Sequence, residues 1–337
     1  MSNQPEPGRR LWRAPSEVPG ALEPGVLTIG NFDGVHRGHQ HLLRAVADCA
    51  SERGLHARAL TFHPHPRHVM TGQACPELIT GYEDRNQLVL AAGIEDLLDL
   101  DFTREFAQHS PEEFVRRYLV DLLNARVVIL GRDTRFGRRN EGGFETMCEL
   151  GERFGFEVMS VEDLHLESCG PERVSSSRIR RALDAGHMEQ ATSMLGRWHF
   201  VSDVVCHGFK RGRELGFPTA NFSASPSGLV PADGVYAGFF SVLDGDRFLT
   251  RTPATISVGT NPTFAEGPPH RVVETYVHGS HDYDLYDRAA RVEFVSRLRP
   301  TLAFEGVEAL VTQMHDDVAV THSTLAALPD RRGASAC

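Results

Sequence analysis

The first half of the chain alternates short apolar runs, which predict buried strands, with longer stretches in which apolar residues recur at helical spacing. The predicted strands are residues 26–29, 57–62, 96–102, 126–130 and 157–161. The predicted helices are residues 40–51, 83–92, 110–122, 144–154 and 174–186. Strands and helices in strict alternation predict an α/β domain, with a doubly wound parallel sheet covered by helices on both faces.

The pattern changes near residue 186, where helical spacing gives way to short runs of β-forming residues. These runs predict strands at residues 200–206, 235–243, 254–258, 272–277 and 291–298. Several short strands in succession are typical of an antiparallel barrel. A final helix over residues 304–324 is expected to plug or flank the barrel. Its predicted apolar face is Val307, Leu310, Val311, Met314 and Val318. We therefore expect domains over residues 1–186 and 187–330, followed by a disordered tail.

Composition supports a globular protein. A length of 337 residues suits about two domains, and the content of 41% hydrophobic and 24% charged residues excludes a disordered chain. The formal net charge of -10 argues against a nucleic-acid partner bound through a broad basic surface. No apolar run approaches the roughly 20 residues of a membrane span, and the N-terminal stretch lacks a signal-peptide core. We expect a cytoplasmic protein with no membrane partner. Its six scattered cysteines are expected to be reduced thiols. The sequence leaves both a monomer and a homo-oligomer open.

The turn after the first strand carries the most specific signal. Residues 30–39 read Gly-Asn-Phe-Asp-Gly-Val-His-Arg-Gly-His. Glycines let the backbone approach a ligand closely, and a helix N-terminus offers free N–H groups that suit phosphate. His36 and His39 flank Gly38, so one turn of chain can direct two imidazoles to one point. Two ordinary surface histidines are the alternative, but the spacing and the context favour phosphate binding. The stretch resembles the nucleotidylyltransferase signature, which implies that the two histidines stabilise the phosphates of a nucleoside triphosphate.

Two more polar loops follow predicted strands, and ligands in parallel sheets bind beyond the carboxyl ends of the strands. The first is residues 63–68 (His-Pro-His-Pro-Arg-His), where the prolines predict an extended segment with His63 and His65 on one side. A metal site is the alternative there, although the segment lacks nearby cysteine or carboxylate ligands. The second is residues 131–139, with Asp133 and four arginines; a solvated charged face is its alternative. We expect the three loops to converge on one cleft.

A further anion site is expected where Ser-Ser-Ser-Arg over residues 175–178 opens a helix. The serine hydroxyls, the free amides of the helix N-terminus and Arg178 all suit phosphate. Simple helix capping by serine is the alternative.

The predicted barrel contains its own candidate chemistry. Glycines and basic residues over 208–216 predict a mobile flap suited to phosphates. Thr219 and Asn221 are two residues apart in extended chain, so their oxygens face one side and suit a Mg²⁺ shell completed by ATP phosphates. Glu274 lies in an apolar run, where it is a candidate general base. Its alternative is a surface-facing glutamate on a half-exposed strand.

These motifs occur together, in this order, in one family. From about residue 26 to residue 325, the chain resembles the bifunctional bacterial riboflavin kinase/FAD synthetases. The resemblance covers residues 30–40, 61–66, 133–137, 175–180, 215–221, 231–236, 257–264, 274 and 291–298. It implies a Rossmann-like doubly wound nucleotidylyltransferase domain, followed by a small antiparallel β-barrel kinase domain with a C-terminal helix. It also implies two reactions: the barrel phosphorylates riboflavin with ATP to give FMN, and the first domain adenylylates FMN with a second ATP to give FAD and pyrophosphate.

The resemblance also implies the residues of each site. The implied catalytic residues are His36, His39, Arg178 and Glu274. The implied ATP contacts of the adenylyltransferase are Gly30, Asn31, Phe32, Asp33, Gly34, His36, Gly38, His39, Ser176, Ser177 and Arg178. The implied flavin contacts there are His63, Pro64, His65, Asp133 and Phe136. The implied ATP contacts of the kinase are Gly208, Lys210, Gly212, Arg213, Gly216, Thr219 and Asn221, and Thr219 and Asn221 are also the implied Mg²⁺ ligands.

Two residues depart from the family pattern without touching a position with a named chemical role. Asp203 stands where the family usually has glycine, and is expected to repel ATP or narrow its pocket. Thr134 replaces an aromatic residue in the Asp133 loop, and is expected to loosen flavin packing. Three alternatives remain: an FMN adenylyltransferase paralogue whose barrel only binds flavin, a non-catalytic flavin or nucleotide sensor, and a nucleotidylyltransferase acting on another phosphate ester.

Overall fold

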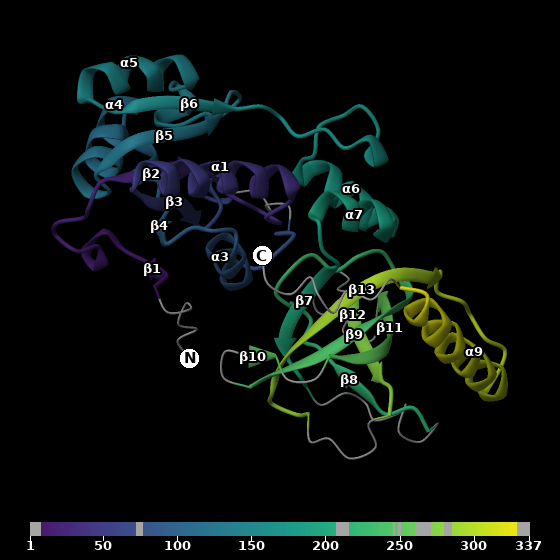
Figure 1. Ribbon diagram of the computed structural model, residues 1–337. Coiled ribbons are helices and arrows are strands. Elements are labelled where there is room, and N and C mark those ends of the chain that lie inside the picture. Colours follow the sequence, from purple (N-terminus) through teal and green to yellow (C-terminus); the bar gives the residue numbers. More distant parts are fainter. Residues whose placement is uncertain are drawn as a thin grey trace. The chain divides into compact units, whose positions relative to one another are not determined.

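Two separate sheets organise the chain, one parallel and one antiparallel (Figure 1). This computed structural model describes residues 8–71, 77–206, 216–244, 247–248, 251–260, 271–279 and 285–328. One packing unit comprises Met1–Pro76 and Tyr82–Val174, and the other comprises Glu77–Gly81 and Ser175–Cys337. The expected functional boundary at residue 186 stays a prediction. The flap residues Gly208, Lys210, Gly212 and Arg213, the matching residues 261–264 and the tail over 330–337 lie outside the described residues.

The sheet of the first unit has the order β1-β4-β3-β2-β5-β6, and every neighbouring pair is parallel. Its strands are β1 (Arg10–Trp12), β2 (Gly25–Ile29), β3 (His56–His63), β4 (Asp96–Asp101), β5 (Ala125–Gly131) and β6 (Glu157–Val161). From the central β2 the chain builds outward through β3 and β4, and then on the other side through β5 and β6. This order confirms the doubly wound fold, and its reversal between β2 and β5 marks where such folds bind ligands.

Strand β1 was not predicted. It pairs with β4 at the edge of the sheet. Arg10 of β1 donates to both carboxylate oxygens of Asp96, from Nε at 2.6 Å and from Nη2 at 2.9 Å. A strand of three residues is too short to show an alternation of apolar and polar residues. Its position depends on this long-range contact, which the local sequence does not indicate.

Helices cover both faces of this sheet because successive strand residues point to opposite sides. Leu27 and Ile29 of β2 pack in one core, whereas Val26 packs in the other. The helices are α1 (Arg37–Arg53), α2 (Pro66–Thr71), α3 (Tyr82–Ala91), α4 (Pro111–Phe114), its π-helical continuation η3 (Val115–Leu122), and α5 (Phe144–Phe154). Short 3₁₀ turns are η1 (Pro15–Glu17), η2 (Phe106–Gln108), η4 (Arg138–Asn140) and η5 (Glu167–Cys169). Residues of α1 and α3 line the Val26 core, and residues of η3 and α5 line the other.

The second unit contains the expected antiparallel barrel, preceded by two helices. The helices are α6 (Ser176–Ala185) and α7 (Met188–Leu195), and the strands are β7 (His199–Val204), β8 (Thr219–Asn221), β9 (Gly234–Asp244), β10 (Arg247–Phe248), β11 (Thr252–Thr260), β12 (Arg271–Val277) and β13 (Ala289–Arg299). The strand order is β7-β13-β9-β11-β12-β8, with β10 paired to β9. An isolated antiparallel pair joins the two ends of this order, and in it the N–H of Cys206 donates to the carbonyl of Asn221 at 2.8 Å. This pair closes the barrel.

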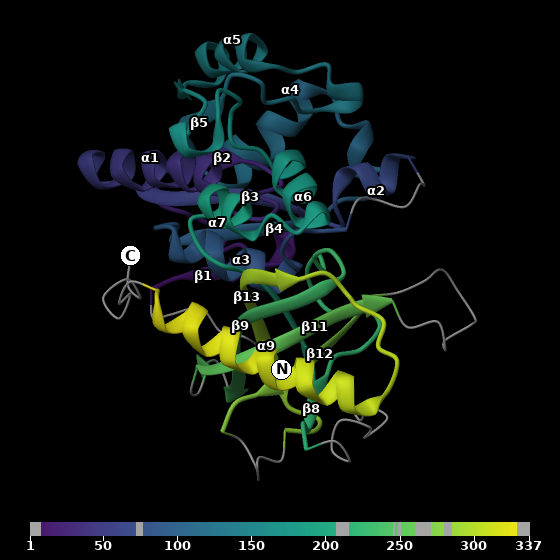
Figure 2. The ribbon, with the colours of Figure 1, turned by 90° about the vertical axis from the view of Figure 1, so that its right-hand side faces the viewer.

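The C-terminal helix α9 (Val307–Ala326) lies along the barrel (Figure 2) and packs against β9, β11 and β13. The predicted apolar face is partly wrong, because Val307 is 61% exposed whereas Asp317 and Thr321 are buried. Arg299 of β13 donates to Asp317 from Nε at 2.8 Å and from Nη2 at 2.7 Å. The hydroxyl of Thr321 lies 2.8 Å from that of Thr255 on β11. The remaining predicted face residues, Leu310, Val311, Met314 and Val318, are half-buried. Polar contacts therefore fix the centre of this helix.

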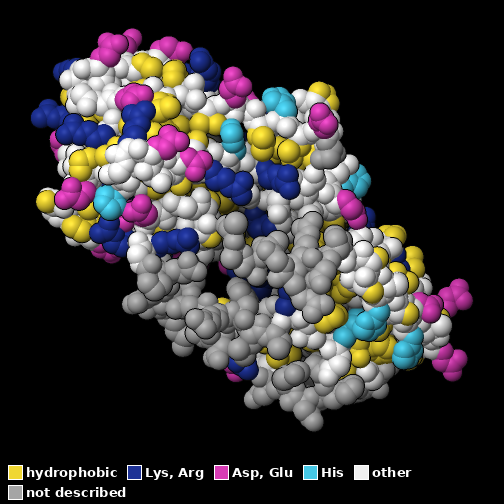
Figure 3. Space-filling view, viewed as in Figure 1, with side chains coloured by type: hydrophobic (Ala, Val, Ile, Leu, Met, Phe, Trp, Pro, Cys, Tyr) yellow, Lys and Arg dark blue, Asp and Glu magenta, His cyan; other side chains and the backbone are white. Residues whose placement is uncertain are grey.

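Charged side chains of both signs are interspersed over the first unit on the face shown in Figure 3. Within the described part of the chain, no helix has the length and apolar character required to cross a membrane. Among the described cysteines, Cys49, Cys148 and Cys206 are free thiols.

Candidate active sites

The turn between β2 and α1 combines a strained backbone with tight packing. Phe32, Gly34 and Val35 have φ angles of 50°, 79° and 38°, a left-handed conformation that a β-branched residue such as Val35 rarely adopts. The side chains of Phe32 and Val35 are each 1% exposed and belong to the core beneath the turn. Packing therefore holds the backbone in a conformation that is unfavourable without these contacts, as is common at ligand-binding turns.

His36 and His39 stack against each other at the start of α1. The helix begins at Arg37, three residues earlier than predicted, so that His36 is the N-cap and His39 lies in the first turn. The Nδ1 atom of His36 accepts a hydrogen bond from the backbone N–H of His39 at 3.2 Å. The two ring centroids are 3.6 Å apart, with 17° between the ring planes. Because Nδ1 of His36 is an acceptor, the proton of its neutral ring lies on Nε2.

The ring of His39 has an unsatisfied nitrogen. Its Nδ1 is buried and has no hydrogen-bond partner among the described residues. Burial lowers the pKa of His39 well below its usual value, and the neighbouring His36 lowers this pKa further. A phosphate ligand would supply both a hydrogen-bond acceptor and a negative charge, which favours the protonated ring. The pair is thus suited to an anion bound at the N-terminus of α1.

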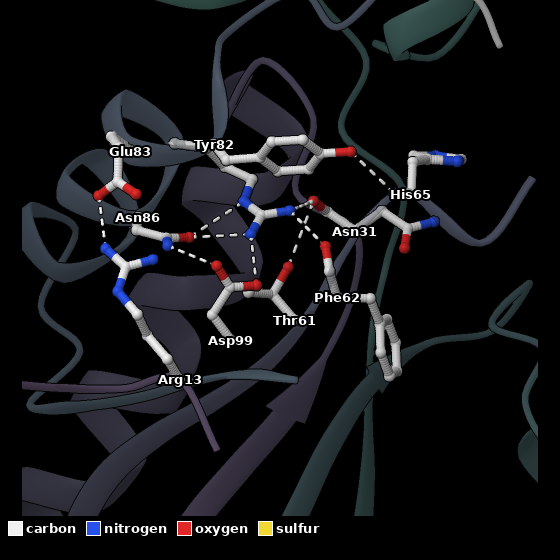
Figure 4. Close-up of polar contacts among 10 residues, drawn as sticks. Arg13, Asn31, Thr61, Phe62, His65, Tyr82, Glu83, Asn86 and Asp99 are labelled. Atoms are coloured by element: carbon white, nitrogen blue, oxygen red, sulfur yellow. Dashed lines mark hydrogen bonds and ion pairs between the residues drawn. The ribbon is translucent and has the colours of Figure 1, made fainter. Parts of the chain in front are cut away.

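The loop after β3 differs from its prediction. Pro66 is the first residue of α2, where its fixed φ suits a helix. The expectation of an extended segment through residue 68 is therefore wrong from Pro66 onward. The ring of His63 meets the ring of Tyr82 edge-on, with centroids 4.1 Å apart. The Tyr82 hydroxyl accepts a hydrogen bond from the N–H of His65 at 2.8 Å (Figure 4). Tyr82, which no sequence motif indicated, therefore fixes this loop from α3.

The loop after β5 is held by an ion pair and by the core. Asp133 lies 2.6 Å from Nη1 of Arg173, which also contacts Asp163 at 3.2 Å. Phe136 is 6% exposed and packs against Phe114, with ring centroids 5.9 Å apart. Arg173 was missed because its partner lies 40 residues earlier in the chain. Contact of Asp133 or Phe136 with a flavin stays a prediction.

The predicted anion site at residues 175–178 forms the N-terminus of α6, in the second unit. Ser175 is the N-cap, and its hydroxyl accepts from the N–H of Arg178 at 3.5 Å. Ser176 and Ser177 are the first two residues of the helix. Capping, the alternative interpretation, therefore accounts for Ser175, while the other two serines stand at the helix N-terminus together with Arg178.

The barrel brings its three candidate residues onto one face. Strands β8 and β12 are antiparallel neighbours, and Glu274 lies directly opposite Asn221. Side chains of such cross-strand pairs have Cβ atoms about 5 Å apart. Thr219 is two residues before Asn221 and shares its face. All three residues are half-buried, whereas the intervening Ala220 and Thr275 are buried.

The oxygen donors on this face fit a hard cation. The amide nitrogen of Asn221 donates to the carbonyl of Thr219 at 3.2 Å, which leaves Oδ1 as the amide atom suited to a metal. The Thr219 hydroxyl supplies a second oxygen, and Mg²⁺ commonly completes its shell with phosphate oxygens and water. No group of three or more His, Cys, Asp or Glu suited to a metal occurs in the described part of the chain. Gly216, just before β8, has a φ of 84°.

Asp203 has a structural partner on each carboxylate oxygen. Its Oδ1 accepts from the N–H of Val204 and its Oδ2 from the N–H of Ser223, both at 2.8 Å. The bond from Ser223 ties β7 to the segment after β8, close in sequence to the Cys206–Asn221 pair that closes the barrel. Glycine, the residue expected here from the resemblance, has no side chain to make them. The expected effect of Asp203 on ATP stays a prediction.

Comparisons with known proteins match both halves of the chain. Residues 19–178 match the family model described as FAD synthetase, and residues 195–325 match the one described as riboflavin kinase. Curated proteins named bifunctional riboflavin kinase/FMN adenylyltransferase include one from Listeria monocytogenes, 34% identical over 90% of this chain and 94% of its own. Another, from Bacillus subtilis, is 35% identical over 87% of this chain and 90% of its own. A solved structure titled as a macrolide-efflux protein from Streptococcus pneumoniae has a TM-score of 0.80 and 28% identity, covering 94% of this chain and 99% of its own.

Proposed function

Because the chain belongs to the family of bifunctional riboflavin kinase/FMN adenylyltransferases, we propose that it phosphorylates riboflavin to FMN and then adenylylates FMN to FAD. One observation carries the proposal: the two folds each hold a separate set of phosphate-handling groups. The stacked His36 and His39 lie at the reversal point of the parallel sheet, and Thr219, Asn221 and Glu274 share one face of the barrel. Its proposed substrates are the small molecules riboflavin, FMN and ATP, and its proposed location is the cytoplasm, where ATP is made.

In the adenylyl transfer, a phosphate oxygen of FMN attacks the α-phosphorus of ATP and pyrophosphate leaves. The attacking phosphate is already anionic, so the reaction requires positioning and charge stabilisation but no general base. His36 presents Nε2–H, and His39 presents a buried nitrogen that lacks a partner among the described residues. We assign both rings to the phosphates of ATP. The N-terminus of α6, with Ser176, Ser177 and Arg178, is proposed as a second phosphate-binding element.

The remaining contacts of the adenylyltransferase follow from the loops at the strand ends. The turn over residues 30–38 is assigned to ATP, and the flavin is assigned to His63, Pro64, His65, Asp133 and Phe136. Because Phe136 is packed in the core, we propose that it supports the Asp133 loop from beneath.

In the kinase reaction, the ribityl 5′-hydroxyl of riboflavin attacks the γ-phosphorus of ATP and ADP leaves. Glu274 is proposed to accept the hydroxyl proton as the new P–O bond forms. Thr219 and Asn221 would hold Mg²⁺ through their side-chain oxygens, and the cation would neutralise charge on the phosphates. Glu274 lies directly opposite Asn221, so the base and the phosphate-binding groups share one site.

Incubation of the purified protein with riboflavin, ATP and Mg²⁺, followed by chromatography, tests the proposal. Both FMN and FAD are expected as products. FAD formed only from supplied FMN would indicate an adenylyltransferase with a flavin-binding barrel. Neither product would indicate a sensor.

Two substitutions test the separation of the sites. His36→Ala is expected to stop FAD formation while FMN still accumulates. Glu274→Ala is expected to stop FMN formation, while supplied FMN is still converted to FAD. Circular dichroism establishes that each variant is folded. Loss of both activities in either folded variant would refute the assignment of two separate sites.

A further inference from the structure

A buried arginine that belongs to none of the sequence motifs, Arg85 of α3, directs its five N–H donors to protein acceptors (Figure 4). Its Nη2 donates to Asp99 Oδ1 at 2.8 Å and to Asn86 Oδ1 at 2.9 Å, and its Nε donates to the same Asn86 oxygen at 3.1 Å. Its Nη1 donates to the carbonyl of Phe62 at 2.8 Å and makes a longer contact of 3.5 Å to the carbonyl of Asn31. The Arg85 and Asp99 side chains are 2% and 3% exposed, so the ion pair is fully enclosed.

The two carbonyls lie where neighbouring strands lead into the two loops assigned to the adenylyltransferase. Asn31 lies in the turn after β2, and Phe62 immediately precedes His63 in β3. The hydroxyl of Thr61 also donates to the carbonyl of Asn31, at 3.4 Å. Because β2 and β3 are parallel neighbours, one planar group spans the carboxyl ends of both strands.

Tyr82 extends this network to the far side of the flavin loop. The guanidinium of Arg85 lies 5.0 Å from the centroid of the Tyr82 ring, within the range of a cation–π contact. The hydroxyl of that same tyrosine accepts from the N–H of His65. The first turn of α3 therefore contacts the loop both before and after Pro64.

We propose that Arg85 is a positioning residue for adenylyl transfer, which sets the ATP-binding turn against the flavin-binding loop through the carbonyls of Asn31 and Phe62. The proposal deepens the proposed function and rests on it. Arg85 is not assigned any contact with a substrate. In a reaction that requires only alignment and charge stabilisation, the spacing of these loops sets the distance between the FMN phosphate and the α-phosphorus, and an error of about 1 Å in such a distance costs about 100-fold in rate.

Arg85→Lys tests this role because it keeps the positive charge beside Asp99 but removes the planar fork. Lysine has three donors on a flexible stem, whereas arginine has five in a fixed plane. One ammonium group cannot reach Asp99, Asn86 and both carbonyls. The charge balance of the core is therefore conserved while the connection between the loops is lost.

Arg58→Lys is a matched control in the same unit. Arg58 of β3 is 1% exposed and pairs at 3.0 Å with Asp96. Asp96 is a buried aspartate of β4, the strand that also carries Asp99. It also donates to two backbone carbonyls, those of Glu23 at 2.6 Å and Leu123 at 3.1 Å. Neither carbonyl belongs to a loop assigned to substrate, so the same substitution perturbs the core without separating the loops.

We expect Arg85→Lys to lower kcat for FAD formation from FMN by about 10- to 100-fold, and to change the KM for ATP much less. Arg58→Lys should keep kcat within about 2-fold, although both variants should melt at lower temperatures. Both variants should phosphorylate riboflavin at the wild-type rate, because that reaction is assigned to the other unit. Wild-type kcat in folded Arg85→Lys, or an equal loss in Arg58→Lys, would overturn the proposal.

Amide hydrogen exchange provides a readout that does not depend on activity. In Arg85→Lys, the amides of residues 30–36 and those of His63 and His65 should exchange faster than in the wild type, whereas Arg58→Lys should leave them unchanged. If Arg85→Lys does not fold, the paired substitution Arg85→Met with Asp99→Asn leaves no uncompensated buried charge and should show the same low kcat and fast exchange. Unchanged exchange in the folded variant refutes the positioning role. Absence of FAD synthesis in the wild type refutes the proposed function instead.

Discussion

Replacing Gly30 by alanine tests how tightly the turn after β2 is packed against the histidine pair. A Cβ atom at this position would lie 2.8 Å from Cε1 of Phe32, 2.9 Å from Cζ and 3.2 Å from Cδ1. Carbon atoms in contact are normally about 3.5–4.0 Å apart, so the Phe32 ring would have to withdraw by about 0.7 Å or more. The ring is 1% exposed, and it meets the His39 ring edge-on with centroids 5.5 Å apart.

The size of the effect follows from this lack of free space. Overpacking of a filled core typically costs about 1–3 kcal/mol, and we expect a loss of this size in the free energy of unfolding. Because the Phe32 ring contacts His39, and His39 stacks on His36, the displacement should reach both imidazoles. A shift of this size is expected to lower kcat for FAD formation by about 10- to 100-fold.

The assay measures urea unfolding and FAD formation from supplied FMN in Gly30→Ala and in a control, Gly20→Ala. No atom lies within 4 Å of a Cβ built at Gly20, so the control should stay within about 0.5 kcal/mol of the wild type and keep its activity. Riboflavin phosphorylation by the same chains reports on the other unit and should not change. Wild-type stability in Gly30→Ala would refute the packing argument. Lower stability with wild-type kcat would refute the transmission from Phe32 to the histidines.

Three further changes probe the second unit. Asp203→Ala removes the acceptors of two backbone N–H groups, including that of Ser223, and should lower the urea unfolding free energy by about 1–3 kcal/mol; no change would show that water replaces the carboxylate. Burial lowers the pKa of His199 to about 4, below its value of about 6.5 in the unfolded chain, so the unfolded state binds the extra proton and stability falls as pH drops below 6.5. We expect the free energy of unfolding to fall by about 2 kcal/mol between pH 7 and pH 5. Urea titrations at both pH values should show that His199→Gln lacks this loss. Asp317→Ala leaves Arg299 without its carboxylate on α9 and should cost up to about 3 kcal/mol; an unchanged melting temperature would show that this ion pair does not anchor the helix.

The alternation of apolar runs and helical stretches was sufficient to predict the parallel sheet, because its central strands β2 and β5 are almost wholly buried and read as nearly continuous apolar runs. The same reasoning missed β1, whose place depends on the contact of Arg10 with Asp96. It also misjudged the packed face of α9, where Asp317 and Thr321 are buried through polar partners on β13 and β11. Burial of a polar residue depends on a partner that is distant in sequence.

The residues of the candidate sites likewise divide into those that the sequence indicated and those that only the structure reveals. The histidines of the turn after β2, and the roles of Thr219, Asn221 and Glu274, could be proposed from local spacing and from the resemblance. The pairing of Asn221 with Glu274 across two strands is known only from the structure. The structure adds the unsatisfied Nδ1 of His39 and the stacking of the two rings. Arg85 and Tyr82 could not be predicted, because a single arginine or tyrosine in a helix carries no signal until its partners are known.

The backbone and the side chain of Asn221 have different roles. Its backbone carbonyl closes the barrel by accepting from Cys206, while its side chain faces the same way as Glu274. A change of side chain at this position therefore leaves the closing hydrogen bond in place. A descendant of this protein with a single substitution at this position would lose the proposed phosphoryl transfer and still inherit a closed barrel that can evolve toward another use.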